Sequence, residues 1–406
     1  MDDVSNEIKK RRNEILSRYS FEWDGLIDEV IKLKFNDSVG DEEGFCWIDL
    51  PEFSNSYGLK DNKVLFPKKY VKQIEKTTKN VDYRDCNWIQ ACDYLSSLSF
   101  EKDTFLNSLI SLSSKNKIPE LFEKAWVNRY LLFLRDWAAY KTNKNTLIGK
   151  ISTPRIILTH DVDALNVSRG LKLRQYVQNK NLLNLNNKEN LNMINDIIRV
   201  EKNYGFKSIF FLSGNSISTR TPLADPNYNL DKISDTLSKI VIEGFEIGLH
   251  PGVFSSKVNQ FFKKEKNKLE KYSNVKILKT RNHWLANSKN STWNIYSKNK
   301  IKTDFSIGYN DIPGFRNATA LQYKPKKYNV NLISMFAMDG QYLNFGNKDI
   351  GLFFDDIKKY ILEIINVGGV SSINTHQRLF HEYYGFMNIY KSVIEYLRNL
   401  KELKYK

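Results

Sequence analysis

The chain of 406 residues is too long for one ordinary domain, and this length predicts two or three domains. Hydrophobic residues make up 41% of it, enough for sizeable cores. The net charge of +16 is spread along the chain, and no recognisable nucleic-acid module is present, so we expect no nucleic-acid partner.

The cysteine content and the lack of long apolar runs indicate where the protein is located. The three cysteines, Cys46, Cys86 and Cys92, form no CxxC pair, and such a small odd number argues against a disulfide framework. The first residues, MDDVSNEIKKRRNEIL, lack the apolar region of a signal peptide. No apolar run approaches 18 residues, so no membrane span is expected. We therefore expect a cytoplasmic protein.

Residues 1–150 have the pattern of a mainly α-helical domain. The stretches DCNWIQACDYLSSLSF and PELFEKAWVNRYLLFLRDWAAYK carry apolar residues at helical spacing. A short strand is expected at GFCWIDL, and KTNKNTLIGKISTP has the composition of a polar linker. The sequence thus predicts a helical accessory domain that ends near residue 150.

Residues 151–406 have a different pattern, in which short β-rich runs alternate with helical stretches. The runs are RIILT, SIFFLSG, FEIGLH, VKILKTRNH, TDFSIGY, NLISMFAM and GVSSINTH. Alternation of this kind predicts a parallel sheet or barrel, and seven runs in about 250 residues favour a barrel-like α/β domain. Gly205 and Gly244 stand where helix C-caps are expected.

The most basic stretch covers residues 257–281. Its Val, Phe and Leu positions recur at helical spacing, which indicates an amphipathic helix with a solvated basic face. The alternative is a surface that attracts an anionic partner, such as a nucleotide-linked sugar, an acidic glycan or a lipid head group.

Ionisable residues gather at the ends of the expected strands. Four of the five histidines lie there: His160, His250, His283 and His376. In an α/β barrel the functional face is the one at the carboxyl ends of the strands. Asp161 and Asp163 are two apart, so in an extended strand they share one face. Two carboxylates on one face repel each other unless a cation or a shared proton intervenes, and imidazoles nearby suggest a divalent, Zn²⁺-type metal.

The order of these motifs resembles that of the polysaccharide deacetylase, or NodB-homology, family of carbohydrate esterases (family 4). THDVD, FEIGLHPG, TRNHW, TDFSIGYNDIPGFR and INTH resemble its five motifs in turn, over about residues 155–380. The resemblance implies a distorted (β/α)₇ barrel behind the helical N-terminal domain. It also implies metal-dependent removal of an N- or O-acyl group from a sugar.

The same resemblance implies a role for each matching residue. Asp161 would be the general base, held ionised by Arg281, and Asp163 and His250 would be metal ligands. His376 would be the general acid, and Asp304 would support it. The metal would be Zn²⁺, with Co²⁺ or another divalent ion as alternatives.

The chain departs from the family pattern in its second motif. Phe254 stands where a further histidine ligand is usual, so His283 is the expected substitute, with Ser255, Ser256 or water as alternatives. His160 replaces an aromatic residue, and we expect it to pack there, the alternative being contact with metal or substrate. His381 is expected at the surface or the substrate rim.

Three functions remain open at this level. The first is a deacylase of cell-surface polysaccharide synthesis, acting on a sugar, a nucleotide-sugar or a lipid-linked glycan, with peripheral contact to the inner membrane face. The second is another enzyme on the same barrel, such as an amide hydrolase, a deformylase or an acyl transferase. The third is a degenerate, non-catalytic glycan-binding protein. Trp284, Tyr309 and Arg316 are candidates for a sugar cleft. The segments SGN at 213–215 and DPNY at 225–228 are expected as loops on the same face, and MDGQYL, with Asp339, could equally be a turn.

Overall fold

The structure is a computed structural model of the whole chain. It describes residues 5–54, 62–72, 81–101, 119–165, 190–215, 225–343, 349–381 and 384–400. Within these residues no helix is long and apolar enough to cross a membrane.

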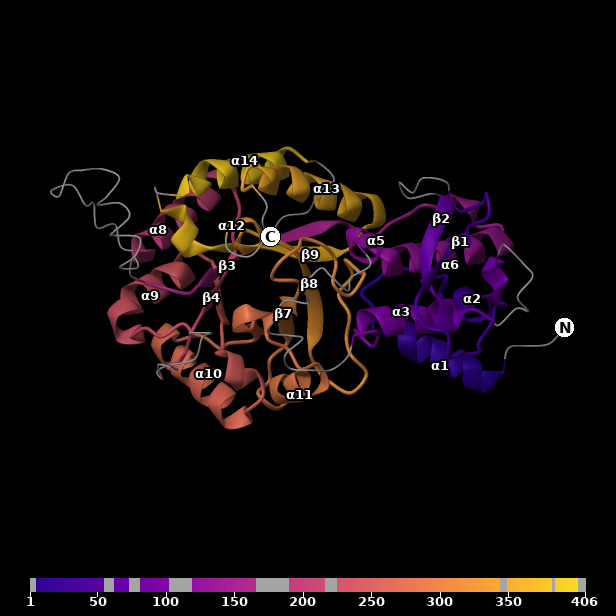
Figure 1. Cartoon of the computed structure of the whole chain (residues 1–406), viewed down its shortest axis with the longest axis horizontal. Helices are drawn as coiled ribbons and strands as arrows, with labels where there is room; N and C mark the ends of the chain where they lie inside the picture. The colour runs from indigo at the N-terminus through magenta and orange to yellow at the C-terminus, as the bar shows by residue number, and fades with distance from the viewer. Residues whose placement is uncertain are drawn as a thin grey trace.

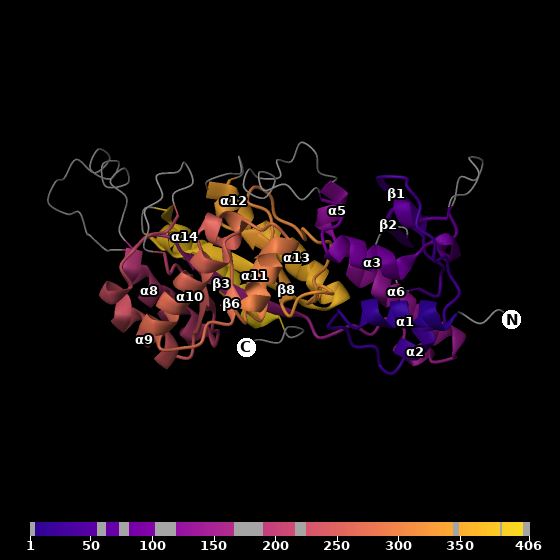
Figure 2. The same cartoon turned by 90° about the horizontal axis from the view of Figure 1, so that it is seen from below.

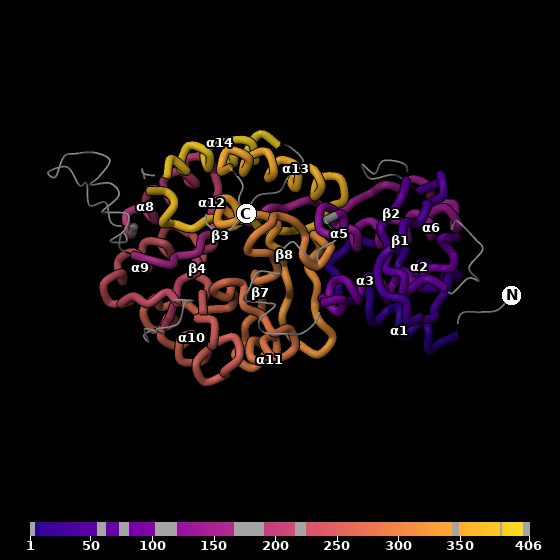
Figure 3. The backbone as a smooth tube through the Cα atoms, viewed as in Figure 1, coloured from indigo at the N-terminus to yellow at the C-terminus, as the bar shows by residue number. Residues whose placement is uncertain are grey.

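The N-terminal region lies at one end of the molecule (Figures 1 and 3). Its described helices are α1 Asn6–Leu16, α2 Ile27–Ile31, α3 Trp88–Ser96, α5 Pro119–Glu123 and α6 Trp126–Lys141, with short 3₁₀ turns η2 Lys68–Tyr70, η3 Tyr83–Asp85 and η5 Asn145–Leu147. The strand expected at GFCWIDL is present as β1 Phe45–Asp49. It pairs antiparallel with β2 Lys63–Pro67, which the sequence did not reveal.

The rest of the chain builds a closed barrel of seven parallel strands, so the predicted (β/α)₇ barrel is confirmed. The strands are β3 Arg155–Val162, β4 Ile209–Leu212, β5 Glu246–Leu249, β6 Lys279–Thr280, β7 Thr303–Ile307, β8 Asn331–Met338 and β9 Val370–His376. They follow one another in chain order around the barrel, and β9 pairs with β3 to close it. All seven predicted strand runs are present, although β6 keeps only two residues.

Helices cover the outside of the barrel (Figures 1 and 2). They are α8 Asn190–Tyr204, α9 Ser234–Ile242, α10 Asn259–Ser273, α11 Asn290–Lys298, α12 Gly340–Leu343, α13 Leu352–Val367 and α14 Phe386–Asn399, with 3₁₀ turns η6 Leu230–Ile233, η7 Val253–Ser256, η8 His283–Leu285 and η9 Gln377–Phe380. Gly205 and Gly244 follow α8 and α9 with φ of 82° and 78°, so both expected C-caps are confirmed.

The basic stretch forms the amphipathic helix that the sequence favoured. In α10, Phe262 and Leu269 are fully buried, while most lysines of this helix face solvent. A single residue, Glu265, breaks the pattern because its carboxylate is turned inward, where it accepts a hydrogen bond from Gly252 N at 3.1 Å.

The N-terminal region packs tightly against the barrel helices. Arg129 of α6 forms a buried ion pair with Glu363 of α13, at 2.6 Å, and Asn128 Nδ2 donates to Gly368 O at 2.8 Å. One continuous cluster of buried apolar side chains includes residues from both regions. The division into 1–150 and 151–406 therefore stays a proposal, since the two regions share one core.

Candidate metal and catalytic site

The strand β3 delivers the two aspartates to the same side. Side chains alternate along a strand, so Asp161 and Asp163 both point into a cavity at the carboxyl end of the barrel. Val162, between them, points away and packs in the hydrophobic core. His160 points the other way. Its Nε2 lies 2.6 Å from Glu201 and its Nδ1 lies 2.7 Å from Thr375 Oγ1, so the expected packing role of His160 is what the structure shows.

Asp161 is a buried carboxylate with strong partners. Arg281 Nη1 donates to its Oδ1 at 3.1 Å, and Asn374 Nδ2 donates to its Oδ2 at 2.8 Å. Burial raises the pKa of Asp161, but the charges of Arg281, His250 and His376 outweigh burial, so its pKa lies below the ordinary value. The contact expected between Arg281 and Asp161 is present, and it keeps the carboxylate ionised.

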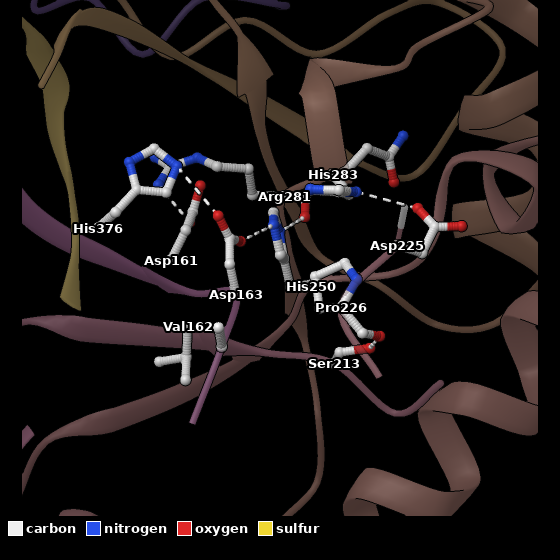
Figure 4. A network of polar contacts seen from close by, with 12 residues as sticks. Asp161, Val162, Asp163, Ser213, Asp225, Pro226, His250, Arg281, His283 and His376 are labelled. Carbon is white, nitrogen blue, oxygen red and sulfur yellow. Dashed lines mark hydrogen bonds and ion pairs between the residues drawn. The ribbon is translucent and has the colours of Figure 1, made fainter. Parts of the chain in front are cut away.

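Three side chains converge beside Asp161: Asp163, His250 and His283. Each offers one ligand atom, and these atoms lie within 4.8 Å of one another. Asp163 follows β3, His250 follows β5, and His283 begins the turn after β6. Figure 4 shows Asp163 between His250 and His376, with His283 beyond His250. The barrel thus brings together the three residues that the sequence proposed as ligands.

Second partners fix the orientation of both imidazoles. His250 Nδ1 donates to the backbone oxygen of Arg281 at 2.7 Å, and His283 Nδ1 lies 2.9 Å from Asp225 Oδ1. Each bond leaves Nε2 as the nitrogen available to a ligand. Burial lowers the pKa of His283, which favours the neutral imidazole that metals bind.

The donor set fits a divalent ion. Asp163 Oδ1 and His250 Nε2 are buried and face each other at 3.3 Å, an ion pair when His250 is protonated, and among the described residues neither atom has another polar partner at hydrogen-bond distance. Buried polar atoms of this kind need a partner, and a cation between them supplies one. One carboxylate with two imidazoles is a typical donor set of catalytic zinc sites. The serine alternatives fit less well, since Ser255 Oγ donates to Glu265 and Ser256 Oγ donates to Val253 O.

The second carboxylate oxygen of Asp163 faces two cations. Arg378 Nη1 forms an ion pair with Oδ2, and His376 Nε2 lies 3.6 Å from the same oxygen. Burial raises the pKa of Asp163, but Arg378, His376 and His250 together bring it well below the ordinary value. Asp163 is therefore charged, with Oδ2 neutralised by the protein and Oδ1 left for an ion.

The partner of His376 differs from the one expected. Asp339, not Asp304, supports it: His376 Nδ1 lies 2.6 Å from Asp339 Oδ1, and His376 N donates to Asp339 Oδ2 at 2.6 Å. Burial lowers the pKa of His376, but Asp339 outweighs it, so the pKa lies above the ordinary value. This pair favours the protonated form of His376 and turns Nε2 toward the cavity.

The expectation that Asp304 supports His376 is wrong because Asp304 lies near the start of β7, far down the strand from the carboxyl end. There it accepts hydrogen bonds from Asn287 Nδ2 at 3.0 Å, Trp293 Nε1 at 3.2 Å and Ser306 N at 2.8 Å. Asp304 is completely buried, and burial raises its pKa. It holds the segment after β6 to the barrel.

The cavity over these residues has a volume of about 370 Å³, with Trp284, Asn310, Met338 and Arg378 in its wall. Of the proposed sugar-cleft residues, only Trp284 lines it. Tyr309 is buried under Arg316, and Arg316 is engaged with Glu101 at 2.8 Å, so neither reaches the cavity. His381 is also buried, at 6% exposure, contrary to the expected surface position.

The sequence did not single out two residues of the site, Asn374 and Arg378. Both carried a usable signal, since they stand two residues before and two after His376, at the end of a predicted strand. For two others the sequence indicated the place but not the role. Asp225 begins the loop expected on the functional face, and it holds His283. Asp339 directly follows the run NLISMFAM, in a segment that could equally be a turn, and it holds His376.

No family model and no curated protein matches the chain. Among solved structures, a Mycobacterium smegmatis protein described as a polysaccharide deacetylase is 12% identical, with a TM-score of 0.44, covering 62% of this chain and 86% of that one. The polysaccharide deacetylase of Bacillus cereus is 10% identical, with a TM-score of 0.35, covering 62% and 91%.

A pseudoenzyme of carbohydrate esterase family 4 from Bacillus anthracis is 11% identical, with a TM-score of 0.31, covering 63% of this chain and 70% of that one. The chain is thus similar, at low identity, to solved polysaccharide deacetylases and to a pseudoenzyme of the same family.

Proposed function

We propose that this protein is a metal-dependent deacylase that removes an N- or O-acyl group, such as acetyl, from a sugar or sugar conjugate. The observation that carries the proposal is the meeting of Asp163, His250 and His283 beside a separate, ionised Asp161. Asp161 is not one of these three residues, so its carboxylate is free to accept a proton. A divalent ion, most simply Zn²⁺, would supply an acidified water and polarise the acyl carbonyl when bound.

The reaction then depends on two proton transfers by this chain's residues. Asp161 accepts a proton from the attacking water, and Arg281 and Asn374 hold its two oxygens in place for this step. His376 donates a proton to the departing amine nitrogen or alkoxide oxygen, with Asp339 stabilising the imidazolium beforehand. Water and the acyl sugar thereby give a carboxylic acid and the free amine or alcohol.

The size of the cavity supports a small reacting group. About 370 Å³ suffices for an acylated sugar unit but not for a long chain, and the indole of Trp284 in its wall offers a face for a sugar ring. We extend the proposal to substrates of cell-surface polysaccharide synthesis in the cytoplasm, either a nucleotide-sugar or a lipid-linked glycan at the inner membrane face. The resemblance of the motifs supports this extension.

Metal content and acyl release test the proposal together. Purified full-length protein is loaded with Zn²⁺ or Co²⁺, dialysed and analysed for bound metal. Acetate release is measured with an N-acetylglucosamine tetramer and with an O-acetylated xylo-oligosaccharide. We expect about one ion per chain, lost in Asp163→Ala and His283→Ala. The matched variant Asp161→Asn should keep the ion and release no acetate. Wild-type protein without bound metal, or full activity of Asp161→Asn, would contradict the mechanism.

The ion pair between Arg378 and Asp163 favours a second candidate, a glycan-binding protein without catalysis. A guanidinium already neutralises one oxygen of Asp163, which leaves less negative charge for a metal. In that case the cavity would bind a sugar in the absence of any ion. Equal sugar binding with and without a chelator, together with no metal uptake, would support it over the deacylase.

A further inference from the structure

A second cavity, of about 710 Å³, lies between the N-terminal region and the barrel. Its walls come from α1, η2 and α3 on one side, and from α11 and the segment 323–328 on the other (Figure 1). It shares no lining residue with the candidate metal site. We call it the interdomain cleft.

The acids of the interdomain cleft are already neutralised by neighbouring cations. Glu14 Oε1 lies 2.7 Å from Lys326 Nζ, Asp93 Oδ1 lies 2.5 Å from Arg18 Nη1, and Glu101 Oε2 lies 2.8 Å from Arg316 Nη2. Two of these pairs, Glu14 with Lys326 and Glu101 with Arg316, also tie the two regions together, since Lys326 and Arg316 belong to the barrel. The walls are therefore held firmly, and their acids do not repel an anion.

Four further cations line the same walls. Lys289 donates to the backbone oxygens of Leu98 and Glu101, and the other three are Arg11, Lys69 and Lys327. Among the described residues none of the three has an ion-pair partner, and the ammonium of Lys69 lies over the ring of Tyr94, 5.9 Å from its centre. They come from α1, η2 and the 323–328 segment, so they surround the cleft rather than cluster at one point. The interdomain cleft thus has an excess of positive charge distributed over its walls.

Two half-buried tyrosine rings, Tyr94 and Tyr328, line the cleft between these charges. Trp293 is only 2% exposed and forms part of the floor, with its ring centre 6.2 Å from that of Tyr328. The floor is fixed, because buried Tyr323 donates its hydroxyl to Asp93 at 2.7 Å. Tyrosine and tryptophan present an apolar face with a polar edge, which suits the faces and hydroxyls of sugar rings.

We propose that the interdomain cleft is a binding site for an acidic oligosaccharide, a short chain of sugars that carries several carboxylates. Separate cations around the walls match charges spaced along a ligand better than the single dense charge of one phosphate group. The rings between them bind the sugar faces. The volume falls within the usual range of about 300–1,000 Å³ for small-ligand sites and suits two or three sugar units.

The interdomain cleft also lies close to the metal site. Leu285 lines the metal-site cavity and Lys289 lines the cleft, and the four residue-to-residue steps from one to the other span at most about 14 Å. An oligosaccharide of a few units covers such a distance. The cleft would therefore hold one end of a glycan near the site, although its binding of acidic sugars does not depend on the proposed hydrolysis.

Calorimetric titration of the full-length protein tests the proposal, with trigalacturonate, which has three carboxylates, against neutral galactotriose. We expect trigalacturonate to bind at least tenfold more tightly. The double variant Arg11→Glu with Lys327→Glu, both exposed residues, should weaken that binding at least tenfold. The matched control Lys263→Glu with Lys264→Glu has the same charge change on exposed α10 and should stay within twofold of wild type.

Two further arms locate the ligand and identify its chemistry. Binding should persist in His283→Ala, which disables the metal site, so its loss there would place the ligand in that site and overturn the proposal. A triglutamate peptide, with at least as many carboxylates and no sugar rings, should bind at least tenfold more weakly than trigalacturonate. Equal affinity for the peptide or for galactotriose, no binding of trigalacturonate, or an unchanged affinity in Arg11→Glu with Lys327→Glu would also overturn it.

Discussion

The site has two halves, and each contains a histidine paired with a carboxylate. The pKa values of the two histidines are shifted in opposite directions. In each half a histidine Nδ1 meets a carboxylate: His283 with Asp225 at 2.9 Å, and His376 with Asp339 at 2.6 Å. Yet the pKa of His283 lies below the ordinary value and that of His376 lies above it. The first half suits a metal, which binds neutral imidazole, and the second suits proton donation.

The difference has two causes: the charge of the paired carboxylate, which is the largest raising influence on the pKa of His376, and the neighbouring imidazole that lowers the pKa of His283. Burial is the largest influence on both pKa values and lowers both. His283 also faces His250, whose charge disfavours a second imidazolium, whereas His376 receives both a side-chain and a backbone contact from Asp339. A histidine–carboxylate pair therefore does not by itself identify an acid or a ligand; its neighbours decide.

Asp225→Asn should damage the metal half alone. The amide still fits the loop but no longer fixes the tautomer of His283, so we expect the affinity for Zn²⁺ to fall by about 10–100-fold. Competition with a chromogenic chelator measures it. As a control, Asp339→Asn should leave that affinity unchanged. Equal weakening in both variants would show that the two halves are not separate.

Asp339→Asn should change the proton half alone. Asp339 raises the pKa of His376 against the effect of burial, so its removal lowers that pKa. Because His376 must be protonated to act, the alkaline limb of the kcat/KM profile should move to lower pH, and activity at pH 8 should drop about tenfold or more. A profile with the same limb as wild type would remove Asp339 from this role.

Asp304→Ala should weaken the fold without touching either half. The indole N–H of Trp293 and the amide of Asn287 lose their buried acceptor, which costs about 1–3 kcal/mol in the free energy of unfolding. Urea denaturation measures this loss, and the pH profile of the folded variant should match wild type. A displaced alkaline limb would return Asp304 to the proton-transfer machinery.

The barrel and the position of the site could be predicted from sequence. All seven strand runs predicted from the sequence are strands in the structure, because the alternating or fully apolar pattern of such a run is local and strong. The ends of parallel strands meet at one face, so His250, His283 and the two aspartates had to lie near one another. The family resemblance, with Phe254 in place of a histidine, made His283 the expected substitute beside the alternatives Ser255, Ser256 and water, and the structure brings His283 to Asp163.

The second partners could not be predicted in the same way. Asp304 and Asp339 are both aspartates on neighbouring strands, and only the register decides which reaches His376. Asp304 is the second residue of β7, whereas Asp339 follows the last residue of β8. A difference of a few residues along a strand decides whether a carboxylate reaches His376 or, like Asp304, binds Asn287 and Trp293 instead. The ion pair of Arg378 with Asp163 likewise depends on the turn after β9.

The short strand β6 gives the barrel a seam. It pairs with β5 at one position, Leu249 with Thr280, and with β7 at two, whereas β3 and β9 pair at seven. His283 is the third residue after β6, and His250 directly follows β5 on the other side of the seam. An ion bound by both imidazoles would link β5 to the segment after β6, where the barrel has the fewest paired residues. Binding of that ion would then complete the catalytic site and stabilise the closed barrel at the same time.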